Sequence, residues 1–338
     1  MSVLRLIFAI SMVFITLSCG HTGDQSPSAL KPVSGFSRLD IYAPFKLQSD
    51  LKGLSSKQKK MLGLLIDASV IMDDLFWKVS FNEPKDQFLA RISDPKLRKF
   101  AALNYGPWDR LDGNKPYIKG YSSKPLGAQF YPKDIRKSEI ESSKLKDIKG
   151  IYSIVSRGLK RELITIPYNV AFQKDLQRAS FLLNQAAELA SNKDFKKYLK
   201  LRAKALLTNK YRSSDMMWMD MKNNPIDVVI GPIENYEDQL FGYRAAFEAY
   251  VLVKDMDWSQ RLARYAKFLP ELQRTLPVDE KYKKEKPGGK ADLNAYDVIY
   301  YGGRSNAGAK TIAINLPNDE EVQLKKGTRR LQLKNIMR

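Results

Sequence analysis

The sequence predicts an α+β fold in which a mainly helical region precedes a mixed β-core with helices. Up to about residue 225 the apolar residues recur mostly at helical spacing, whereas after Ile226 β-branched runs with a period of two appear. The chain has 338 residues, of which 43% are apolar and 28% charged, as is ordinary for a globular protein with a substantial core. We therefore expect a mainly helical region over residues 38–225 and a β-rich region over residues 226–338.

Residues 1–19 are typical of a cleaved export signal. Arg5 precedes an apolar run over residues 6–17 that is too short to span a bilayer, and Ser18 precedes Cys19, the only cysteine. A small residue before a cysteine resembles a bacterial lipoprotein processing site. We therefore expect a lipidated Cys19, a flexible tether over residues 20–37, and attachment of the mature chain to a cell-envelope membrane. The alternative is an ordinary secretory signal with an incidental cysteine.

The lipid anchor has a direct test. Cys19→Ala should release the protein into the soluble fraction of fractionated cells, because the thiol that accepts the lipid is gone and with it the acyl chains that bind the bilayer. Unchanged membrane retention of this variant would contradict lipidation at Cys19.

The elements of the helical region follow from caps and periodicity. Ser55 or Ser56 caps a helix that extends to about Lys78, and Asp94 with Pro95 begins another. Residues 105–132 are dense in Gly, Pro and aromatic residues and predict a long ordered loop. The remaining predictions are a short helix at 134–145, strands at 151–155 and 163–166, helices at 176–190 and 194–208, and a helix capped by Ser213 or Ser214.

Two apolar runs and the polar residues between them dominate the second region. Residues 226–230 predict a buried strand that Gly231 and Pro232 end, because proline cannot continue a central ladder. Residues 245–253 predict a second strand, with Glu248 on the face opposite its apolar residues. Between the runs lie Glu234, Tyr236, Glu237 and Asp238. Such a cluster predicts a cleft, because unpaired buried carboxylates are costly. The alternative is a solvated loop.

The rest of the chain predicts further helices and strands. Asp257 caps a helix to about Thr275, strands are expected at 296–301 and 311–315, and Asn318 or Asp319 begins a last helix. The helical pattern continues to the end of the sequence at Arg338.

Charge and histidine content exclude several functions. The net charge of +20 is unusual, but no nucleic-acid recognition motif accompanies it, so no nucleic-acid partner is predicted. A solvated, lysine-rich surface or attraction to an anionic membrane explains the charge instead. The single histidine, His21, lies beside Cys19, so neither a usual catalytic zinc site nor a Ser-His-Asp arrangement is available to this chain by itself.

Three segments resemble a known family. Residues 233–251, IENYEDQLFGYRAAFEAYV, resemble the dipeptidyl-peptidase III family of zinc exopeptidases, whose members contain Ile-Glu-Thr-Tyr, a Gly, an Arg and Phe-Glu-Gly-Phe at nearly this spacing. Residues 312–335 resemble that family's Asn-Ile-Pro-Asn segment with the following helix, and residues 104–118 resemble its bacterial branch.

The resemblance implies roles for five residues. Glu234 would help to hold the free α-amine of a short peptide, and the Tyr236 hydroxyl would stabilise a tetrahedral intermediate. Glu248, Asn315 and Asn318 would lie near the same amine. Asn235 replaces the family's Thr, and one extra residue separates Tyr236 from Glu248.

The family's zinc motif, His-Glu-x-x-(x)-His, lies downstream of the Asn-Pro-Asn segment, and the sequence ends before such a motif. We expect the substrate-side portion of a zinc enzyme that removes dipeptides from peptide N-termini, truncated before the zinc-bearing helical domain and inactive as given. Zinc is expected for the full-length family and no cofactor for this chain. Two alternatives are a non-catalytic, lipid-anchored peptide-binding protein and a hydrolase that uses Glu234 and Glu248 as a carboxylate pair.

Overall fold

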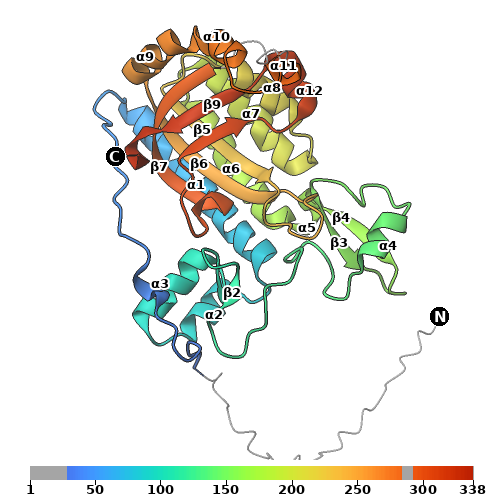
Figure 1. Cartoon of the computed structure of the whole chain (residues 1–338). Helices are drawn as coiled ribbons and strands as arrows, with labels where there is room; N and C mark the ends of the chain where they lie inside the picture. The colour runs from blue at the N-terminus through green and yellow to red at the C-terminus, as the bar shows by residue number, and fades with distance from the viewer. Residues whose placement is uncertain (1–28, 284–291, 338) are drawn as a thin grey trace, which may run out of the picture.

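The computed structural model describes residues 29–283 and 292–337 (Figure 1). The predicted signal, Cys19, His21 and the first half of the predicted tether, residues 20–28, lie outside the described residues. The α+β prediction is confirmed, because a five-stranded mixed sheet lies against a layer of helices. None of the helices in these two ranges is both long and apolar enough to cross a bilayer.

The central sheet has the strand order β5-β6-β7-β9-β8. Its strands are β5 (Ile226–Glu234), β6 (Ala246–Asp255), β7 (Asp292–Gly303), β8 (Ala313–Leu316) and β9 (Arg329–Leu333). β5, β6 and β7 are antiparallel neighbours, β9 pairs with β7 in parallel, and β8 pairs with β9 antiparallel. The first eight residues of β6 are all buried, as expected for a strand that is covered on both faces.

The predicted end of the first strand of this sheet is wrong. β5 does not end at Gly231 and Pro232 but continues to Glu234, with a register shift between Pro232 and Glu234. The strand order explains this, since β5 is an edge strand and an edge strand tolerates the missing N–H of proline.

The last predicted helix is also shorter than expected. α12 (Glu320–Lys326) begins after its N-cap Asp319 and ends at Gly327, whose φ is 77°. The chain then returns as β9 between β7 and β8. This strand was not predicted because a charged residue occupies one of its buried positions. Arg329 is buried there because it stacks on Trp218 at 4.5 Å and pairs with Asp227 at 3.5 Å.

Helices cover one face of the sheet. α1 (Ser56–Ser80) begins with a capping box between Ser55 and Gln58 and packs against β6, β7 and α6. α3 (Pro95–Asn104), α6 (Gln173–Leu189) and α7 (Lys193–Thr208) also lie where the sequence predicts them. Because α1 packs on β6 and β7, the helical region and the sheet share one hydrophobic core.

The remaining elements are short. They are η1 (Arg38–Asp40), α2 (Lys85–Ala90), β1 (Trp108–Asp109), β2 (Lys115–Pro116), α4 (Lys137–Ser142), β3 (Ser153–Arg157), β4 (Leu163–Pro167), α5 (Tyr168–Ala171), α8 (Arg212–Asp220), α9 (Met256–Ala266), α10 (Leu269–Arg274), α11 (Glu280–Lys283), η2 (Arg304–Asn306) and η3 (Lys334–Ile336). Two predicted caps are wrong. α8 begins before Ser213, with Ser214 inside its first turn, and Asp255 rather than Asp257 caps α9, accepting the Trp258 N–H at 2.9 Å.

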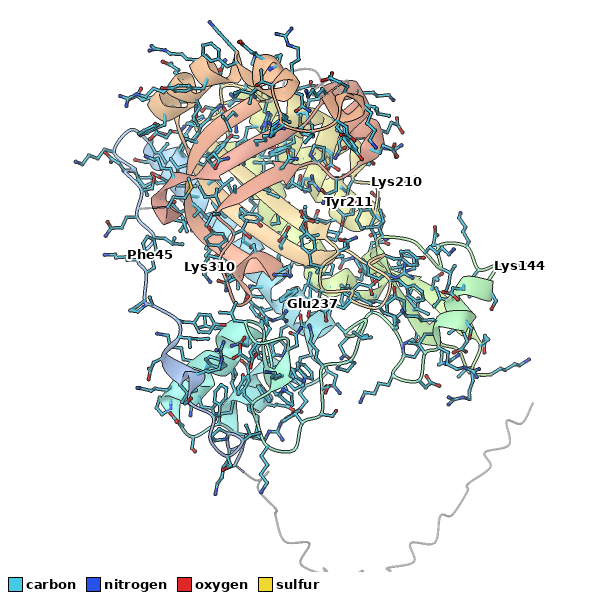
Figure 2. The ribbon with its side chains drawn as sticks, viewed as in Figure 1. Phe45, Lys144, Lys210, Tyr211, Glu237 and Lys310 are labelled. Carbon is cyan, nitrogen blue, oxygen red and sulfur yellow. The ribbon has the colours of Figure 1, made fainter. Side chains whose placement is uncertain are left out.

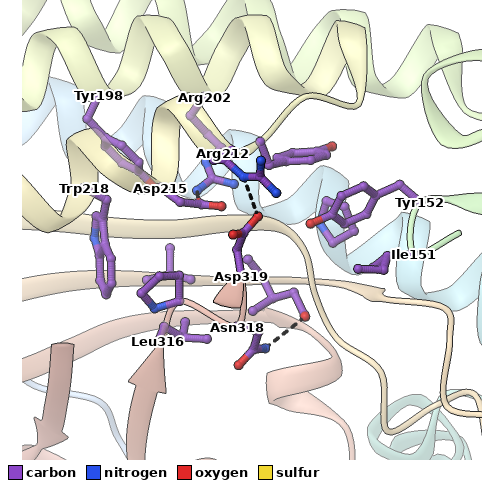
Figure 3. Close-up of a pocket in the computed structure, with 15 residues that line it drawn as sticks. Ile151, Tyr152, Tyr198, Arg202, Arg212, Asp215, Trp218, Leu316, Asn318 and Asp319 are labelled. Atoms are coloured by element: carbon purple, nitrogen blue, oxygen red, sulfur yellow. Dashed lines mark hydrogen bonds and ion pairs between the residues drawn. The ribbon is translucent and has the colours of Figure 1, made fainter. Parts of the chain in front are cut away.

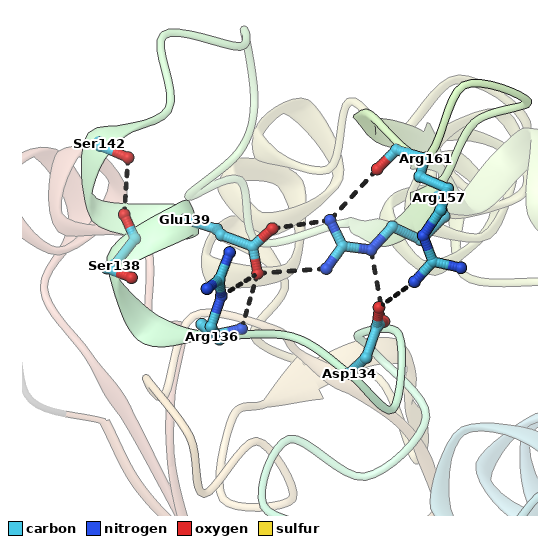
Figure 4. Close-up of polar contacts among 7 residues, drawn as sticks. All are labelled: Asp134, Arg136, Ser138, Glu139, Ser142, Arg157 and Arg161. Atoms are coloured by element: carbon cyan, nitrogen blue, oxygen red, sulfur yellow. Dashed lines mark hydrogen bonds and ion pairs between the residues drawn. The ribbon is translucent and has the colours of Figure 1, made fainter.

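An ion-pair network holds α4 against the β3–β4 hairpin, which projects to the right of the sheet in Figure 1. Arg157 donates to both oxygens of Glu139, at 2.7 and 3.1 Å, and to Asp134 at 3.3 Å, and Arg161 also pairs with Asp134 (Figure 4). The bonds from Arg157 are the main reason that the pKa of Glu139 is lowered to about 2. The network therefore holds α4 and the solvent-exposed hairpin in one arrangement, on the same side of the sheet as the loop that follows β5.

Candidate functional site

A buried carboxylate lies at the centre of the candidate site. Glu248 faces Gly231 of β5 on one side and Gly303 of β7 on the other, and it is 2% exposed. Its Oε2 accepts the Tyr250 hydroxyl at 3.5 Å, whereas its Oε1 has no hydrogen-bond partner. Burial, and next the charge of Glu234, raises the pKa of Glu248 to about 8. Glu248 is therefore mainly protonated at neutral pH.

The second carboxylate belongs to Glu234, the last residue of β5. Glu234 is half-buried, and burial raises its pKa against the opposing effects of Asn318, Arg304 and Tyr236. The Asn318 side chain, which bonds Glu234, also donates to the Ile233 carbonyl oxygen at 3.3 Å (Figure 3). The segment after β8 thus lies against the end of β5, although β5 and β8 are the two edge strands of the sheet. The sheet is curled so that its edges meet at this site.

Arg304 is a component of the site that the sequence did not predict. Its guanidinium lies over the Tyr236 ring at 5.8 Å, and its charge lowers the pKa of both Glu234 and Glu248. Arg304 directly follows Gly303, which has a φ of 67° and where a Cβ would collide with the Phe247 carbonyl oxygen. No local pattern indicates this placement, since pairing between β6 and β7 brings Arg304 beside Glu248.

The other two predicted residues, Tyr236 and Asn315, have different surroundings. Tyr236 is 63% exposed beside Glu234, whose charge is the main cause of a raised Tyr236 pKa. Asn315 is an exposed residue of β8 opposite Arg330 of β9, and no hydrogen bond in the described ranges joins it to the two carboxylates. The structure therefore brings Arg304 together with Glu234, Tyr236, Glu248 and Asn318. Asn315 belongs to β8 and lies outside this group.

The two acidic residues that follow Tyr236 are structural. Glu237 is enclosed by Arg110, at 2.7 and 3.1 Å, and by Lys124. Asp238 accepts the Tyr131 hydroxyl at 2.7 Å and the backbone N–H groups of Tyr243 and Arg244 at 2.9 and 3.0 Å. Of the polar cluster predicted from the sequence, only Glu234 and Tyr236 thus remain available to a ligand.

A cavity of about 270 Å³ lies beside Asn318 (Figure 3). It is bounded by α7, α8, the end of β5 and residues 316–319. A buried ion pair between Arg202 and Asp215 forms one wall, and Arg212 closes another by donating to Asp319 at 3.0 Å. The cavity provides space next to Asn318, which bonds Glu234, and a side chain of a bound molecule could enter it.

Zinc does not fit the residues that the structure describes. Within residues 29–283 and 292–337, no three His, Cys, Asp or Glu side chains come together as a metal site. Zinc is therefore assigned to none of the described residues.

Comparisons with known proteins identify the class. The model of peptidase family M49 matches residues 120–338, so the chain belongs to this peptidase family. The fold agrees with the structure of DPP III from Caldithrix abyssi, with a TM-score of 0.83 and 36% identity over 88% of this chain and 59% of that chain. The structure of dipeptidyl-peptidase III from Corallococcus sp. strain EGB matches with a TM-score of 0.81 and 35% identity, over 88% and 58%.

The resemblance to the dipeptidyl-peptidase III family is thus confirmed. The curated protein named Nudix hydrolase 3 from Arabidopsis thaliana is also similar, with 29% identity over 88% of this chain and 46% of that protein. The chain spans about half to three fifths of the length of these three relatives.

Proposed function

We propose that this chain holds the free N-terminus of a peptide substrate for a dipeptidyl peptidase of family M49. The observation that supports this most is the pair of carboxylates formed by Glu234, at the end of edge strand β5, and Glu248 of the neighbouring strand β6. A carboxylate is the natural partner of an ammonium group, because it accepts charge-assisted hydrogen bonds. Family membership implies that peptides are the ligands.

The two carboxylates have different tasks in this proposal. Glu234 is half-buried and accepts the ammonium directly, while Asn318 orients Glu234 and presents its own amide to the peptide backbone. Glu248 lies deeper and is mainly protonated, since its pKa is about 8. An arriving ammonium favours the charged form of Glu248 and thus lowers its pKa.

Tyr236 and Arg304 act on the reacting end of the bound peptide. Tyr236 is 63% exposed, and the Arg304 guanidinium over its ring adds positive charge beside it. A hydroxyl donor beside a cation suits the stabilisation of a developing oxyanion. We assign Tyr236 this role in hydrolysis, while the metal chemistry of the family lies with residues other than the described ones.

A second candidate function is peptide binding without catalysis, by a protein that a lipid at Cys19 tethers to the cell envelope. The observation that favours it is that Glu234, Glu248 and Asn318 come together within this chain and require no metal. The two candidates share the amine site and differ in whether hydrolysis follows.

The amine site has a specific test. A short peptide with a free N-terminus should bind roughly tenfold to a hundredfold more tightly than its acetylated twin, because a charge-assisted hydrogen bond is worth about 1.5–3 kcal/mol. Glu234→Gln should abolish this preference, since glutamine keeps the shape and removes the charge. Calorimetric titration of both peptides near neutral pH, where the peptide amine is mainly protonated, measures the effect.

A surface carboxylate provides the control. Glu141→Gln removes an exposed charge on α4 outside the site and should leave the preference unchanged. Equal affinity of the two peptides for the unmodified, folded chain would show that the amine site lies elsewhere.

A further inference from the structure

Hydrogen bonds fix both ends of η2, the turn that begins with Arg304. Directly before Arg304, the Gly303 backbone N–H donates to Oδ1 of Asp73 on α1 at 3.0 Å. At the end of the turn, the Asn306 side-chain amide donates to the Tyr105 hydroxyl at 3.0 Å. That hydroxyl donates in turn to the same Oδ1 of Asp73. One carboxylate therefore holds both ends of the segment that contains Arg304.

Asp73 and Tyr105 are both restrained by their surroundings. Asp73 lies on α1, which packs against β6 and β7, and its side chain is 13% exposed. Its other oxygen pairs with Lys85 at 3.3 Å. Tyr105 caps α3 in the left-handed conformation, with a φ of 53°, and is 1% exposed. Because hydrogen bonds to a carboxylate are stronger than neutral ones and burial excludes competing water, these contacts restrain the turn firmly.

The neighbouring backbone leaves the turn little room to move. Gly303 has a φ of 67°, and a Cβ at this position would collide with the Phe247 carbonyl oxygen of β6. The Ser305 hydroxyl is buried and donates to the Ala249 carbonyl oxygen of the same strand at 3.1 Å. The turn is therefore enclosed between α1 and β6, and these contacts set the direction in which the Arg304 side chain leaves the backbone.

The position of the Arg304 guanidinium depends on this backbone. It lies over the Tyr236 ring at 5.8 Å, and its charge lowers the pKa of Glu234 and of Glu248. Its buried Nε has no hydrogen-bond partner among the described residues. Because no bond at Nε orients the guanidinium, a displaced turn would carry the charge of Arg304 away from the two carboxylates.

We propose that Asp73 is a positioning residue of the candidate site, which acts through Gly303 and Tyr105 to hold the Arg304 guanidinium beside Tyr236 and the two carboxylates. This rests on the proposed function and deepens it, because Arg304 supplies positive charge at the reacting end of the peptide. Asp73 lies outside residues 233–251 and 312–335, in which the family motifs occur, so only the tertiary structure reveals this role.

The titration of Glu248 reports the position of Arg304 without any peptide. When a protein is compared with its own Glu248→Gln variant, the difference between their free energies of unfolding grows with pH and stops growing near the folded-state pKa, about 8. We call the pH at which it stops growing the levelling point. Besides burial, Glu234, Arg304 and Tyr250 act on this titration. The comparison cancels other groups that titrate in the same range, such as Lys124, whose pKa is lowered to about 8.

Asp73→Ala should raise the levelling point by roughly half a pH unit or more, because a displaced Arg304 no longer favours the charged form of Glu248. Asp73→Asn should leave it nearly unchanged, since asparagine keeps an oxygen that accepts the Gly303 N–H. The direction separates positioning from direct electrostatics. Loss of the negative charge of Asp73 would by itself lower the pKa of Glu248, and would do so in both variants.

Three further variants complete the experiment. Asp74→Ala is the matched control, since Asp74 also pairs with Lys85 at 3.3 Å and its hydrogen bonds in the described ranges do not reach the turn. It should leave the levelling point unchanged. Arg304→Met should raise the levelling point as Asp73→Ala does, and Asp73→Ala should add nothing in that background. Asn306→Ala removes the bond to Tyr105 and should act in the same direction if Asp73→Ala does not fold.

Three results would overturn the proposal. They are a levelling point that is unchanged or lowered in folded Asp73→Ala, an equal rise in Asp74→Ala, and a rise that Asp73→Ala still produces in the Arg304→Met background. Each would leave Asp73 with a role in stability alone. Because no peptide enters this experiment, its outcome is independent of whether the amine site binds one.

Discussion

Glu237→Gln should lower the free energy of unfolding by about 3–5 kcal/mol, because it leaves two buried cations without their counter-charge. Arg110 and Lys124 hold the Glu237 carboxylate from two sides, and the three side chains are 9%, 3% and 2% exposed, respectively. Burial alone would raise the pKa of Glu237, but the two cations outweigh it and hold that pKa far below its usual range. Urea unfolding at neutral pH measures the loss.

The position of this ion cluster explains the size of the effect. Glu237 lies where the lobe that contains α2 and α3 meets the loop after β5 (Figure 2). The cluster therefore joins two segments that are distant in sequence and fixes the loop that contains Tyr236.

Two further variants complete this test. Asp175→Asn removes the solvent-exposed partner of Lys78 and should cost less than about 1 kcal/mol, since exposed ion pairs contribute little. Replacing Arg110 and Lys124 with Met and Glu237 with Leu together should recover much of the loss, because an apolar cluster needs no counter-charge. A Glu237→Gln protein as stable as the unmodified chain would show that the cluster does not bear on stability.

Glu248→Gln should make the protein more stable above about pH 8, by on the order of 5 kcal/mol, and should change little in acid. The pKa of Glu248 is raised from 4.5 to about 8 in the folded protein, so the folded state binds more protons than the unfolded state between these values. Stability of the unmodified chain therefore falls as pH rises from 4.5 to about 8, and this contribution stays constant at higher pH. Glutamine has no charge to bury and removes the decline.

Unfolding of both proteins across this pH range provides the measurement. Glu234→Gln should make the decline in stability with pH smaller, so that this variant is more stable than the unmodified chain at neutral pH. The reason is that removal of the Glu234 charge lowers the pKa of Glu248 towards its ordinary value. Parallel pH profiles for the unmodified chain and Glu248→Gln would show that Glu248 is not protonated in the fold.

The sequence alone determined the local elements and the family. The capped helix α1, the proline-led helix α3 and the strand β6 depend on neighbouring residues, so their patterns are legible without tertiary information. The motif around Glu234 and the segment 312–335 identified the family together, because their residue types and spacing are specific in combination. The same motif identified Glu248 as a neighbour of Glu234, and the segment 312–335 identified Asn318.

Tertiary structure decided what those patterns left open. Pro232 stays within a strand only because β5 is at the edge of the sheet, and Arg329 lies in β9 only because Trp218 and Asp227 receive its guanidinium. Neither environment is encoded within a few residues of the side chain concerned.

The site shows the same division. Glu237 and Glu234 are three residues apart in similar sequence surroundings, yet one is neutralised by Arg110 and Lys124 and the other remains available to a ligand. Arg304 reaches Tyr236 through the pairing of β6 with β7. The charge state of a carboxylate depends on burial and on charges within a few ångströms, and tertiary contacts set both, because they bring together segments that are far apart in the chain.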